Sequence, residues 1–160
     1  MEIVQVANEH EVGQVQELFR EYWDSFGFTP CFQGFDQELA ALPGKYASPG
    51  GALGLALENG VPAGCVAMRP FDAERCEVKR LYVRPAFRGR GLSHQLMDWV
   101  MKEALTVGYR EMLGDTMPVM QQALAMYLRM GFEQTGPYSS DPTPGAIFLR
   151  YVLKRSSIST

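Results

Sequence analysis

The chain has 160 residues, of which 15 are basic, 18 are acidic and 46% are hydrophobic, and its formal charge is −3. This profile is typical of one soluble domain that is long enough to bury a hydrophobic core. The three cysteines, Cys31, Cys65 and Cys76, are odd in number and show no Cys-x-x-Cys spacing. These features argue against a disulfide scaffold and against a structural zinc site.

Acidic and basic residues are unevenly distributed along the chain. Before Arg69, nine acidic residues stand against two basic ones, a net charge of −7, and from Arg69 onward the net charge is +4. Five basic residues fall within twelve positions, namely Lys79, Arg80, Arg84, Arg88 and Arg90. Such a cluster indicates a local anion site, and the alternative is a solvated charged face.

No targeting segment or membrane span is expected. Residues 1–11 lack a basic region followed by an apolar run, and no stretch approaches about 18 uninterrupted apolar residues. Together with the unpaired cysteines, this pattern predicts a cytoplasmic protein that does not bind membranes.

The first part of the chain is predicted to form a strand, two helices and a meander. A strand over 2–6 precedes a helix in which Asn8 is the N-cap and Glu11 completes a capping box, and a second helix is expected over 36–42. The Asn59-Gly60 pair is a strong hairpin signal between two apolar runs. The meander strands are expected over 52–58, 61–69 and 76–83.

The second part predicts alternating helices and strands. A helix over 89–107 has its apolar residues on one stripe, and Gly108 ends it. A strand over 109–115, a helix over 118–130 and strands over 132–135 and 146–153 follow. The order predicts one α/β domain over residues 1–154, with a mixed, mostly antiparallel sheet of about seven strands, helices on both faces, and a flexible tail over 155–160.

The turn after the strand over 76–83 contains two glycines and three arginines, Arg84, Arg88, Gly89, Arg90 and Gly91. Glycines let the backbone approach a ligand closely, and the free N–H groups at a helix start bind anions. The turn is neither a Walker loop nor a G-x-G-x-x-G fingerprint. It predicts a phosphate site, and the alternative is a glycine-containing helix start with exposed arginines.

Two motifs resemble those of the GNAT superfamily of acetyl-CoA-dependent acyltransferases. The hexapeptide RGRGLS at 88–93 resembles motif A, although Ser93 stands where the family has Gly or Ala. The pattern A-x-x-x-Y-x-x-x-G-F at 123–132 resembles motif B. Both motifs fall on the expected elements in the expected order, and the coarse topology matches that of the family along nearly the whole chain.

The resemblance implies a GNAT-like fold whose central strands splay apart, so that the pantetheine arm of acetyl-CoA inserts between them as a pseudo-strand. Family members often carry Asn where this chain has Met120, and Thr116 is the alternative contact to the arm. Which arginine of the loop reaches the ribose phosphate stays open. The implied cofactor-binding residues are Leu81, Tyr82, Val83, Arg88, Gly89, Arg90, Gly91, Leu92, Ser93 and Thr116.

Acetyl transfer to an amine needs a deprotonated nucleophile, a donor to the oxyanion and a proton for the departing thiolate. The resemblance implies that Tyr127 is the general acid, and the alternative is a core aromatic. Glu77 is the implied general base, with an ion-pair partner for Lys79 or Arg75 as the alternative. The main-chain N–H of Leu81 is the expected oxyanion donor.

The acceptor site is implied to lie between the first two helices and the loop that joins the last two strands. The aromatic connection before the second helix either lines this site or covers the core. Because the first part of the chain is acidic, we expect the acceptor to be a cationic amine. The candidate lining residues are Trp23, Phe26, Phe28, Phe32, Arg69, Tyr138 and Ser139.

These features predict an N-acetyltransferase that moves an acetyl group from acetyl-CoA to a primary amine of a small molecule or peptide, by direct attack in a ternary complex. The alternative is a non-catalytic acyl-CoA-binding or regulatory domain. Neither histidine lies in a metal-binding motif, so no metal is expected. The net acidity argues against nucleic-acid binding, and the resemblance allows a homodimer.

Overall fold

The computed structural model describes residues 1–25, 34–118, 120–138 and 145–154. The strands in these ranges form one sheet in the order β1-β2-β3-β4-β5-β7-β6. Neighbouring strands are antiparallel except for β4 and β5, which are parallel. The mixed, mostly antiparallel sheet expected from the sequence is therefore confirmed. The strands are β1 (Glu2–Gln5), β2 (Ala52–Glu58), β3 (Val61–Pro70), β4 (Arg75–Val83), β5 (Glu111–Thr116), β6 (Glu133–Thr135) and β7 (Ile147–Val152).

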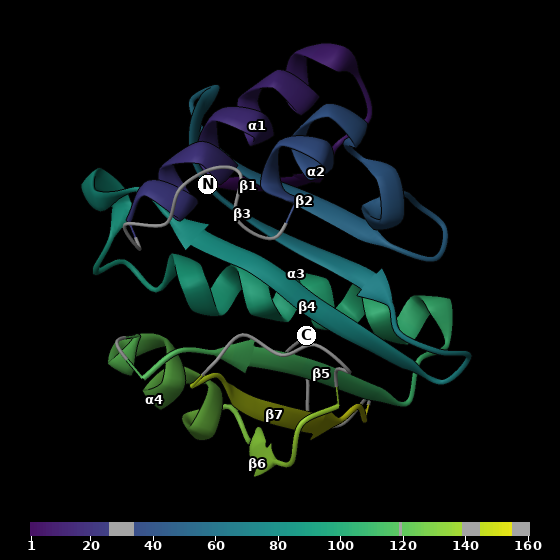
Figure 1. The fold of residues 1–160 in the computed structure, drawn as a ribbon. Coiled ribbons are helices and arrows are strands. Elements are labelled where there is room, and N and C mark those ends of the chain that lie inside the picture. The colour runs from purple at the N-terminus through teal and green to yellow at the C-terminus, as the bar shows by residue number, and fades with distance from the viewer. Residues whose placement is uncertain (26–33, 119, 139–144, 155–160) are drawn as a thin grey trace.

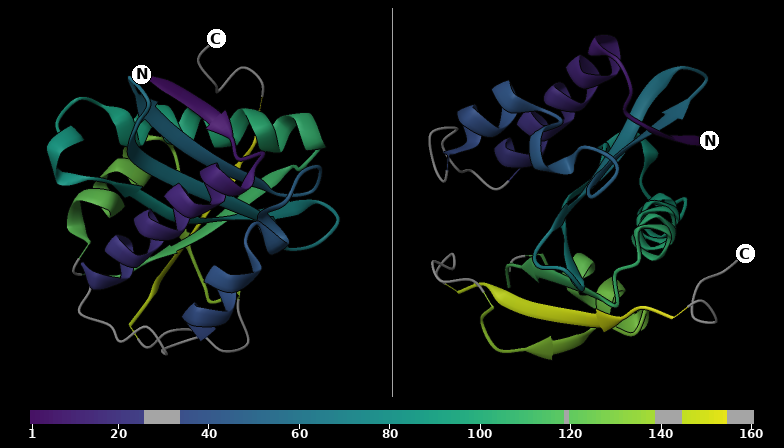
Figure 2. Two further views of the ribbon diagram at one scale, coloured as in Figure 1. Left: turned by 90° about the horizontal axis from the view of Figure 1, so that it is seen from above. Right: turned by 90° about the vertical axis from the view of Figure 1, so that its right-hand side faces the viewer.

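Helices cover both faces of the sheet (Figures 1 and 2). Buried side chains of α1 and α2 pack on one face, and those of α3 and α4 pack on the other, so each face carries its own hydrophobic cluster. No helix in the described ranges is both long and apolar enough to cross a membrane. The helices are α1 (Glu9–Asp24), α2 (Phe35–Ala41), α3 (Leu92–Val107) and α4 (Gln121–Arg129), with single 3-10 turns at η2 (Gly44–Tyr46) and η3 (Pro85–Phe87).

Two local signals in the sequence have the expected structural outcome. The Asn8 side chain accepts the Glu11 N–H at 2.9 Å, while Oε1 of Glu11 accepts the N–H of Ala7 at 2.8 Å, so α1 begins in a capping arrangement. Asn59 and Gly60 take φ values of 52° and 80°, which is the left-handed conformation that a tight turn between β2 and β3 requires.

Three helix and strand starts differ from the expectation by two or more residues. Helix α3 begins at Leu92 and not at 89, because φ is 80° at Gly89 and 76° at Gly91, a conformation that cannot continue a right-handed helix. Helix α4 begins at 121 and not at 118, because the Met120 N–H first closes a turn onto Met117. Strand β5 begins two residues later than expected, since the Tyr109 N–H still bonds to the end of α3.

The central parallel strands part midway. Residue pairing of β4 with β5 runs only from Arg75 opposite Glu111 to Val78 opposite Gly114, while β4 continues to 83 and β5 to 116. In Figure 1 the two strands diverge from this point, and α3 passes behind the gap. We call this divergence the fork. It confirms the splayed central strands expected from the resemblance.

The apex of the fork is the last residue pair between β4 and β5, and a bulge in β4 lies immediately beyond it. Arg80 has a φ of 59°, and the register between β3 and β4 shifts there, so that Lys79 lies opposite Ala67 and Tyr82 opposite Cys65. A bulge of this kind bends its strand and increases the local twist. The bend coincides with the point at which β4 leaves β5.

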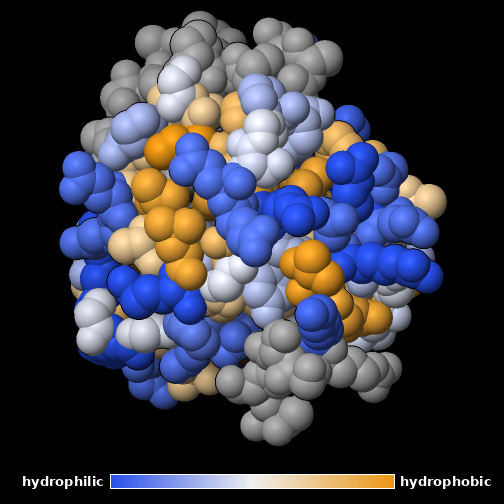
Figure 3. Space-filling model, turned by 90° about the horizontal axis from the view of Figure 1, so that it is seen from below, coloured by the Kyte–Doolittle hydropathy of each residue, from blue (hydrophilic) through white to orange (hydrophobic). Residues whose placement is uncertain are grey.

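The underside of the molecule, over α4, β6 and β7, carries scattered apolar groups among polar ones (Figure 3). Leu128 on α4 and Val152 on β7 belong to the exposed apolar side chains. Because monomers commonly expose single apolar residues, these positions do not by themselves indicate an interface. The possible homodimer stays a prediction.

Candidate active site

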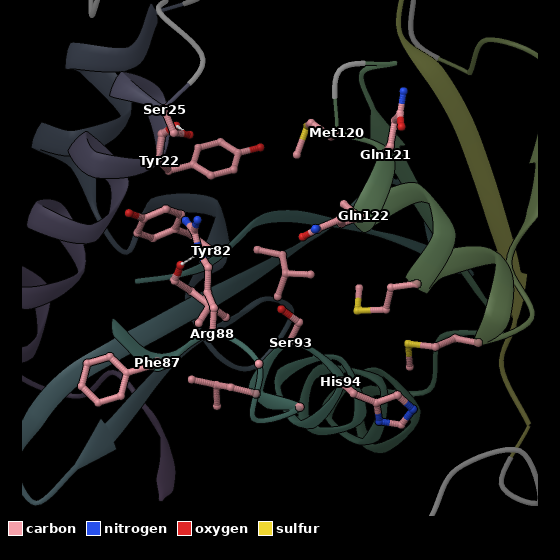
Figure 4. Close-up of a pocket in the computed structure, with 18 of the residues that line it drawn as sticks. Tyr22, Ser25, Tyr82, Phe87, Arg88, Ser93, His94, Met120, Gln121 and Gln122 are labelled. Carbon is pink, nitrogen blue, oxygen red and sulfur yellow. Dashed lines mark hydrogen bonds between the residues drawn. The ribbon is translucent and has the colours of Figure 1, made fainter. Parts of the chain in front are cut away.

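A cleft of about 930 Å³ opens within the fork. Its walls come from the C-terminal end of β4, the loop before α3, the start of α4, and Tyr22 and Ser25 of α1 (Figure 4). This volume is at the upper end of the usual range for small-molecule sites. The residues of the predicted cofactor set that line it are Leu81, Tyr82, Val83, Arg88, Gly89, Gly91, Leu92 and Ser93.

The loop at one end of the cleft has the chemistry of an anion site. No side chain caps the start of α3, and its first turn contains no acidic residue, so N–H groups and the positive end of the helix dipole face the cleft. A Cβ atom at Gly89 or Gly91 would meet nothing within 4 Å, so the two glycines are required for their positive φ and not for space.

Only one of the three loop arginines has its side chain among the lining groups. Nε of Arg88 donates to the carbonyl of Val83 at 2.9 Å, and no carboxylate among the described residues pairs with it. Arg84 instead binds Glu21 at 2.7 Å, and Arg90 binds Glu58 at 3.1 Å. Of the three loop arginines, only Arg88 therefore both lines the cleft and lacks a carboxylate partner among the described residues.

The charge asymmetry of the sequence does not persist in space. Carboxylates of the acidic first part pair with arginines of the basic second part, as in Glu38 with Arg80 at 2.8 Å. The pairs of Arg84 and Arg90 follow the same pattern. The expectation of a cationic acceptor rested on that asymmetry, so it loses its support.

Tyr127 of α4 is buried and does not belong to the residues that line the cleft. Its ring packs edge-on against Phe132, with centroids 5.2 Å apart. Burial raises the pKa of Tyr127 far above its ordinary value, and the charges of Tyr22 and Asp115 raise it further. These contacts place the tyrosine of motif B behind the wall of the cleft, as a poor acid unless a neighbouring group relays its proton.

Tyr22 of α1 is a cleft residue that neither of the two motifs identified. Its hydroxyl points across the cleft toward the start of α4 (Figure 4). Burial raises the pKa of Tyr22 to about 12. Helical spacing alone could not reveal this role, because it depends on where α1 crosses the end of β4.

Glu77 of β4 is buried, and both of its carboxylate oxygens accept hydrogen bonds. Its Oε1 accepts from Nε and Nη2 of Arg69 at 2.9 and 2.8 Å, and its Oε2 accepts the Tyr138 hydroxyl at 2.8 Å. Burial alone would raise the pKa of Glu77, but the charges of Lys79 and Arg69 and these hydrogen bonds hold it below its ordinary value. The arrangement brings two of the candidate lining residues, Arg69 and Tyr138, together on Glu77, and it leaves Glu77 a weak proton acceptor.

The ion-pair alternative for Glu77 is found with Lys79, whose Nζ lies 3.6 Å from Oε2. Arg75, the other partner considered, pairs with Asp72 at 2.7 Å instead. Lys79 also lies 3.4 Å from Oδ1 of Asp115, a residue of β5 that the motifs did not identify. The only sequence signal for Asp115 is its place near the end of a strand that leads into the cleft.

The remaining candidates are divided between core positions and the part of the chain outside the described residues. Thr116 is buried and does not line the cleft itself, but its hydroxyl donates at 3.4 Å to the sulfur of Met120, which does. Trp23 stacks on Phe35 at 3.8 Å between ring centroids, and the Arg80 guanidinium covers the indole. The candidates outside the described residues are Phe26, Phe28, Phe32, Ser139 and the tail over 155–160.

Within the described ranges, no three His, Cys, Asp or Glu side chains are grouped so that they could hold a metal ion. The polar groups of the lining residues are main-chain N–H donors, the guanidinium groups of Arg88 and Arg129, the His94 imidazole, serine hydroxyls, amides and phenols. These groups can bind a phosphorylated ligand and move protons.

Known proteins resemble this chain in sequence and in fold. The model of the acetyltransferase (GNAT) family matches residues 15–132. A Schizosaccharomyces pombe protein named as an uncharacterized N-acetyltransferase is 37% identical over 140 residues, 86% of either chain. A Streptococcus agalactiae acetyltransferase structure has a TM-score of 0.82 at 19% identity, covering 95% of this chain and 98% of its own. A Salmonella typhimurium structure described with its cofactor acetyl-CoA has a TM-score of 0.72 at 18% identity, covering 97% and 96%.

Proposed function

The chain belongs to the acetyltransferase (GNAT) family and is an acyltransferase that acts on amines, and on this basis we propose the reaction that it performs. It transfers the acetyl group of acetyl-CoA to a primary amine of a small molecule or peptide, by direct attack of the amine within a ternary complex. The observation that carries this proposal is the cleft between the diverging strands β4 and β5, which ends on an uncapped helix start.

The residues present fit a coenzyme A molecule in this cleft. The N–H groups at the start of α3 and the Arg88 guanidinium face the place for the diphosphate. Beyond the bulge, the edge of β4 at Leu81 and Val83 is free of β5, so its main-chain groups can pair with the amides of an extended arm. The Salmonella structure described with acetyl-CoA shares this fold, which supports the same ligand here.

Acetyl-CoA supplies an activated thioester to this site. The protein must orient the amine, stabilise the oxyanion and return a proton to the thiolate. We assign the oxyanion contact to the main-chain N–H of Leu81 and the proton return to Tyr127. Because Tyr127 lies behind the cleft wall, Tyr22 is the hydroxyl through which its proton reaches the cleft.

One observation favours the alternative of an acyl-CoA-binding domain without turnover. Glu77, the residue implied as the base, is held by Arg69, Tyr138 and Lys79, and its pKa is lowered. A carboxylate in this state takes up a proton poorly at neutral pH. This alternative holds only if no other group takes the amine proton.

The two functions are separated by measuring thiol release from acetyl-CoA with a panel of primary amines, alongside coenzyme A binding by calorimetry. We expect coenzyme A to bind and at least one amine class to release thiol in step with formation of the N-acetyl product. Binding without turnover for every amine favours the acyl-CoA-binding domain, and absence of binding contradicts both functions.

A further inference from the structure

We propose that Asp115 is the group that receives the acceptor ammonium and takes up its proton. This inference rests on the proposed acetyl transfer and names a different residue from the implied base Glu77. It is carried by the position of Asp115 in the fork, by its incomplete set of partners and by the three tyrosines within electrostatic range of it.

Asp115 lies immediately beyond the apex of the fork. The last paired residues of the two strands are Val78 and Gly114, so Lys79 and Asp115 are the first residues beyond the pairing on either side. Their side chains face one another, with Nζ 3.4 Å from Oδ1. The ion pair therefore spans the point at which a molecule entering between the strands must stop.

The Asp115 carboxylate makes fewer and longer polar contacts than the Glu77 carboxylate. Its ion pair with Lys79 is longer than the 2.7–2.9 Å of a tight charge-assisted hydrogen bond, and its Oδ2 has no partner among the described residues. The side chain is 29% exposed, against 6% for Glu77. Asp115 does not belong to the residues that line the cleft, but its Oδ2 is free of partners among the described residues and its side chain is partly exposed, whereas both oxygens of Glu77 are occupied.

Three tyrosines from three parts of the chain lie within electrostatic range of this carboxylate. Its charge contributes to the raised pKa of Tyr22 on α1, of Tyr127 on α4 and of Tyr138 beyond β6. Tyr22 and Tyr127 are the groups that we assign to proton return. An amine bound at Asp115 is therefore near the donors that the thiolate requires.

The proposed step conserves atoms and charge. The acceptor enters as an ammonium and gives one proton to Oδ2 of Asp115, which releases it to solvent. The freed lone pair of the amine attacks the thioester carbon, so that a C–N bond forms and the C–S bond breaks. The thiolate receives one proton from the tyrosines, and the second proton, which leaves the nitrogen as the amide forms, restores the proton that the tyrosines gave up. Lys79 is a positioning residue that holds the carboxylate at the apex.

The test compares Asp115→Asn with Glu111→Gln. Glu111 lies at the other end of β5, is also 29% exposed and has one cationic partner, Arg150, at 3.6 Å. Both variants exchange a carboxylate for an amide on one strand. The measurements are coenzyme A binding by calorimetry, thermal midpoint, and kcat and KM for the best amine of the panel from pH 6 to pH 10.

We expect Asp115→Asn to bind coenzyme A as the wild type does and to lose about 10²- to 10⁴-fold in kcat at pH 7, the usual contribution of a general base. The loss should shrink as the pH rises, because more of the acceptor then arrives as the free amine. The groups that face Asp115 and also bear on this profile are Lys79, Tyr22, Tyr127 and Tyr138. Glu111→Gln should match the wild type throughout.

Two results overturn the inference, and they differ. If the wild type is active and Asp115→Asn keeps kcat within threefold with the same pH profile, Asp115 is not the base, while the proposed acetyl transfer stands. If the wild type binds coenzyme A but acetylates no amine, the proposed function fails and this assignment fails with it.

Discussion

The Arg84 guanidinium binds the Glu21 carboxylate at 2.7 Å and so ties the end of β4 to α1. The neighbouring residue Tyr22 forms part of the cleft wall, and Arg84 itself leads into the anion-binding loop. One ion pair between a helix and a strand that are about sixty residues apart thus holds two walls of the cleft in place.

Breaking this tie by Glu21→Gln should lower the free energy of unfolding by about 1 kcal/mol, because the pair is partly exposed and screened. For a chain of this length the thermal midpoint should fall by roughly 2–4 °C. Arg20→Gln, at an exposed position of the same helix, is the control and should change the midpoint little. Equal midpoints for Glu21→Gln and the wild type would show that the pair contributes no stability.

Gly91→Ala tests the backbone of the anion-binding loop. The added methyl group meets nothing within 4 Å, but φ is 76°, so the substitution should cost about 1–2 kcal/mol and weaken coenzyme A binding. Gly13→Ala is the matched control, because its Cβ also has open space but lies within α1, where alanine should stabilise by about 0.5–1 kcal/mol. Chemical denaturation and calorimetry measure both effects. The same sign of stability change for the two variants would contradict the argument from φ.

Arg88→Ala should weaken coenzyme A binding by about tenfold, the equivalent of one charge-assisted hydrogen bond. Arg90→Ala provides the comparison, because the Arg90 side chain is paired with Glu58 and does not line the cleft. Its affinity for coenzyme A should stay within about twofold of the wild type. A larger loss for Arg90→Ala than for Arg88→Ala, measured by calorimetry at fixed salt, would reverse the assignment of the phosphate-binding arginine.

Glu77→Gln should destabilise the fold in a pH-dependent way. Because the folded protein lowers the pKa of Glu77, the ionised carboxylate stabilises the fold above the ordinary carboxyl value of about 4.3 and loses this effect as the pH falls through the folded value. We expect a loss of about 2–4 kcal/mol at pH 7 by urea denaturation.

The difference between Glu77→Gln and the wild type should narrow steadily below about pH 4.3. The control is Glu133→Gln, which changes an exposed side chain of β6. Its free energy of unfolding should equal that of the wild type at both low and neutral pH. A difference that stays constant down to pH 3 would mean that the Glu77 charge does not contribute to stability.

Features encoded within a few residues could be predicted from the sequence. The cap at Asn8 and the turn at Asn59-Gly60 depend on neighbours in the chain, and the structure bears out the helix start and the hairpin that they indicate. The fork could not be derived in this way. It was expected only through the family resemblance, because the length of pairing between β4 and β5 is a property of two distant segments.

The candidate site was predicted least well where it depends on charge pairing across the fold. The acidic and basic parts of the sequence suggested separate surfaces, but Glu21 and Glu38 lie against arginines of β4 and the turn that follows it. Asp115 and Tyr22 were missed for a related reason. Neither belongs to a motif, and each gains its place only when α1 and β5 meet the end of β4.

The short pairing of β4 with β5 has a consequence for the mechanics of the molecule. Only four residue pairs join β1–β4 to β5–β7, so this seam is a narrow connection between the two parts of the sheet. A ligand that lies along the free edges of both strands adds contacts to β4 and to β5. It therefore holds the two parts of the sheet, β1–β4 and β5–β7, together. Binding of coenzyme A should therefore make the whole molecule more rigid. We expect amide hydrogen exchange to slow in the strands on both sides of the fork when the ligand is bound.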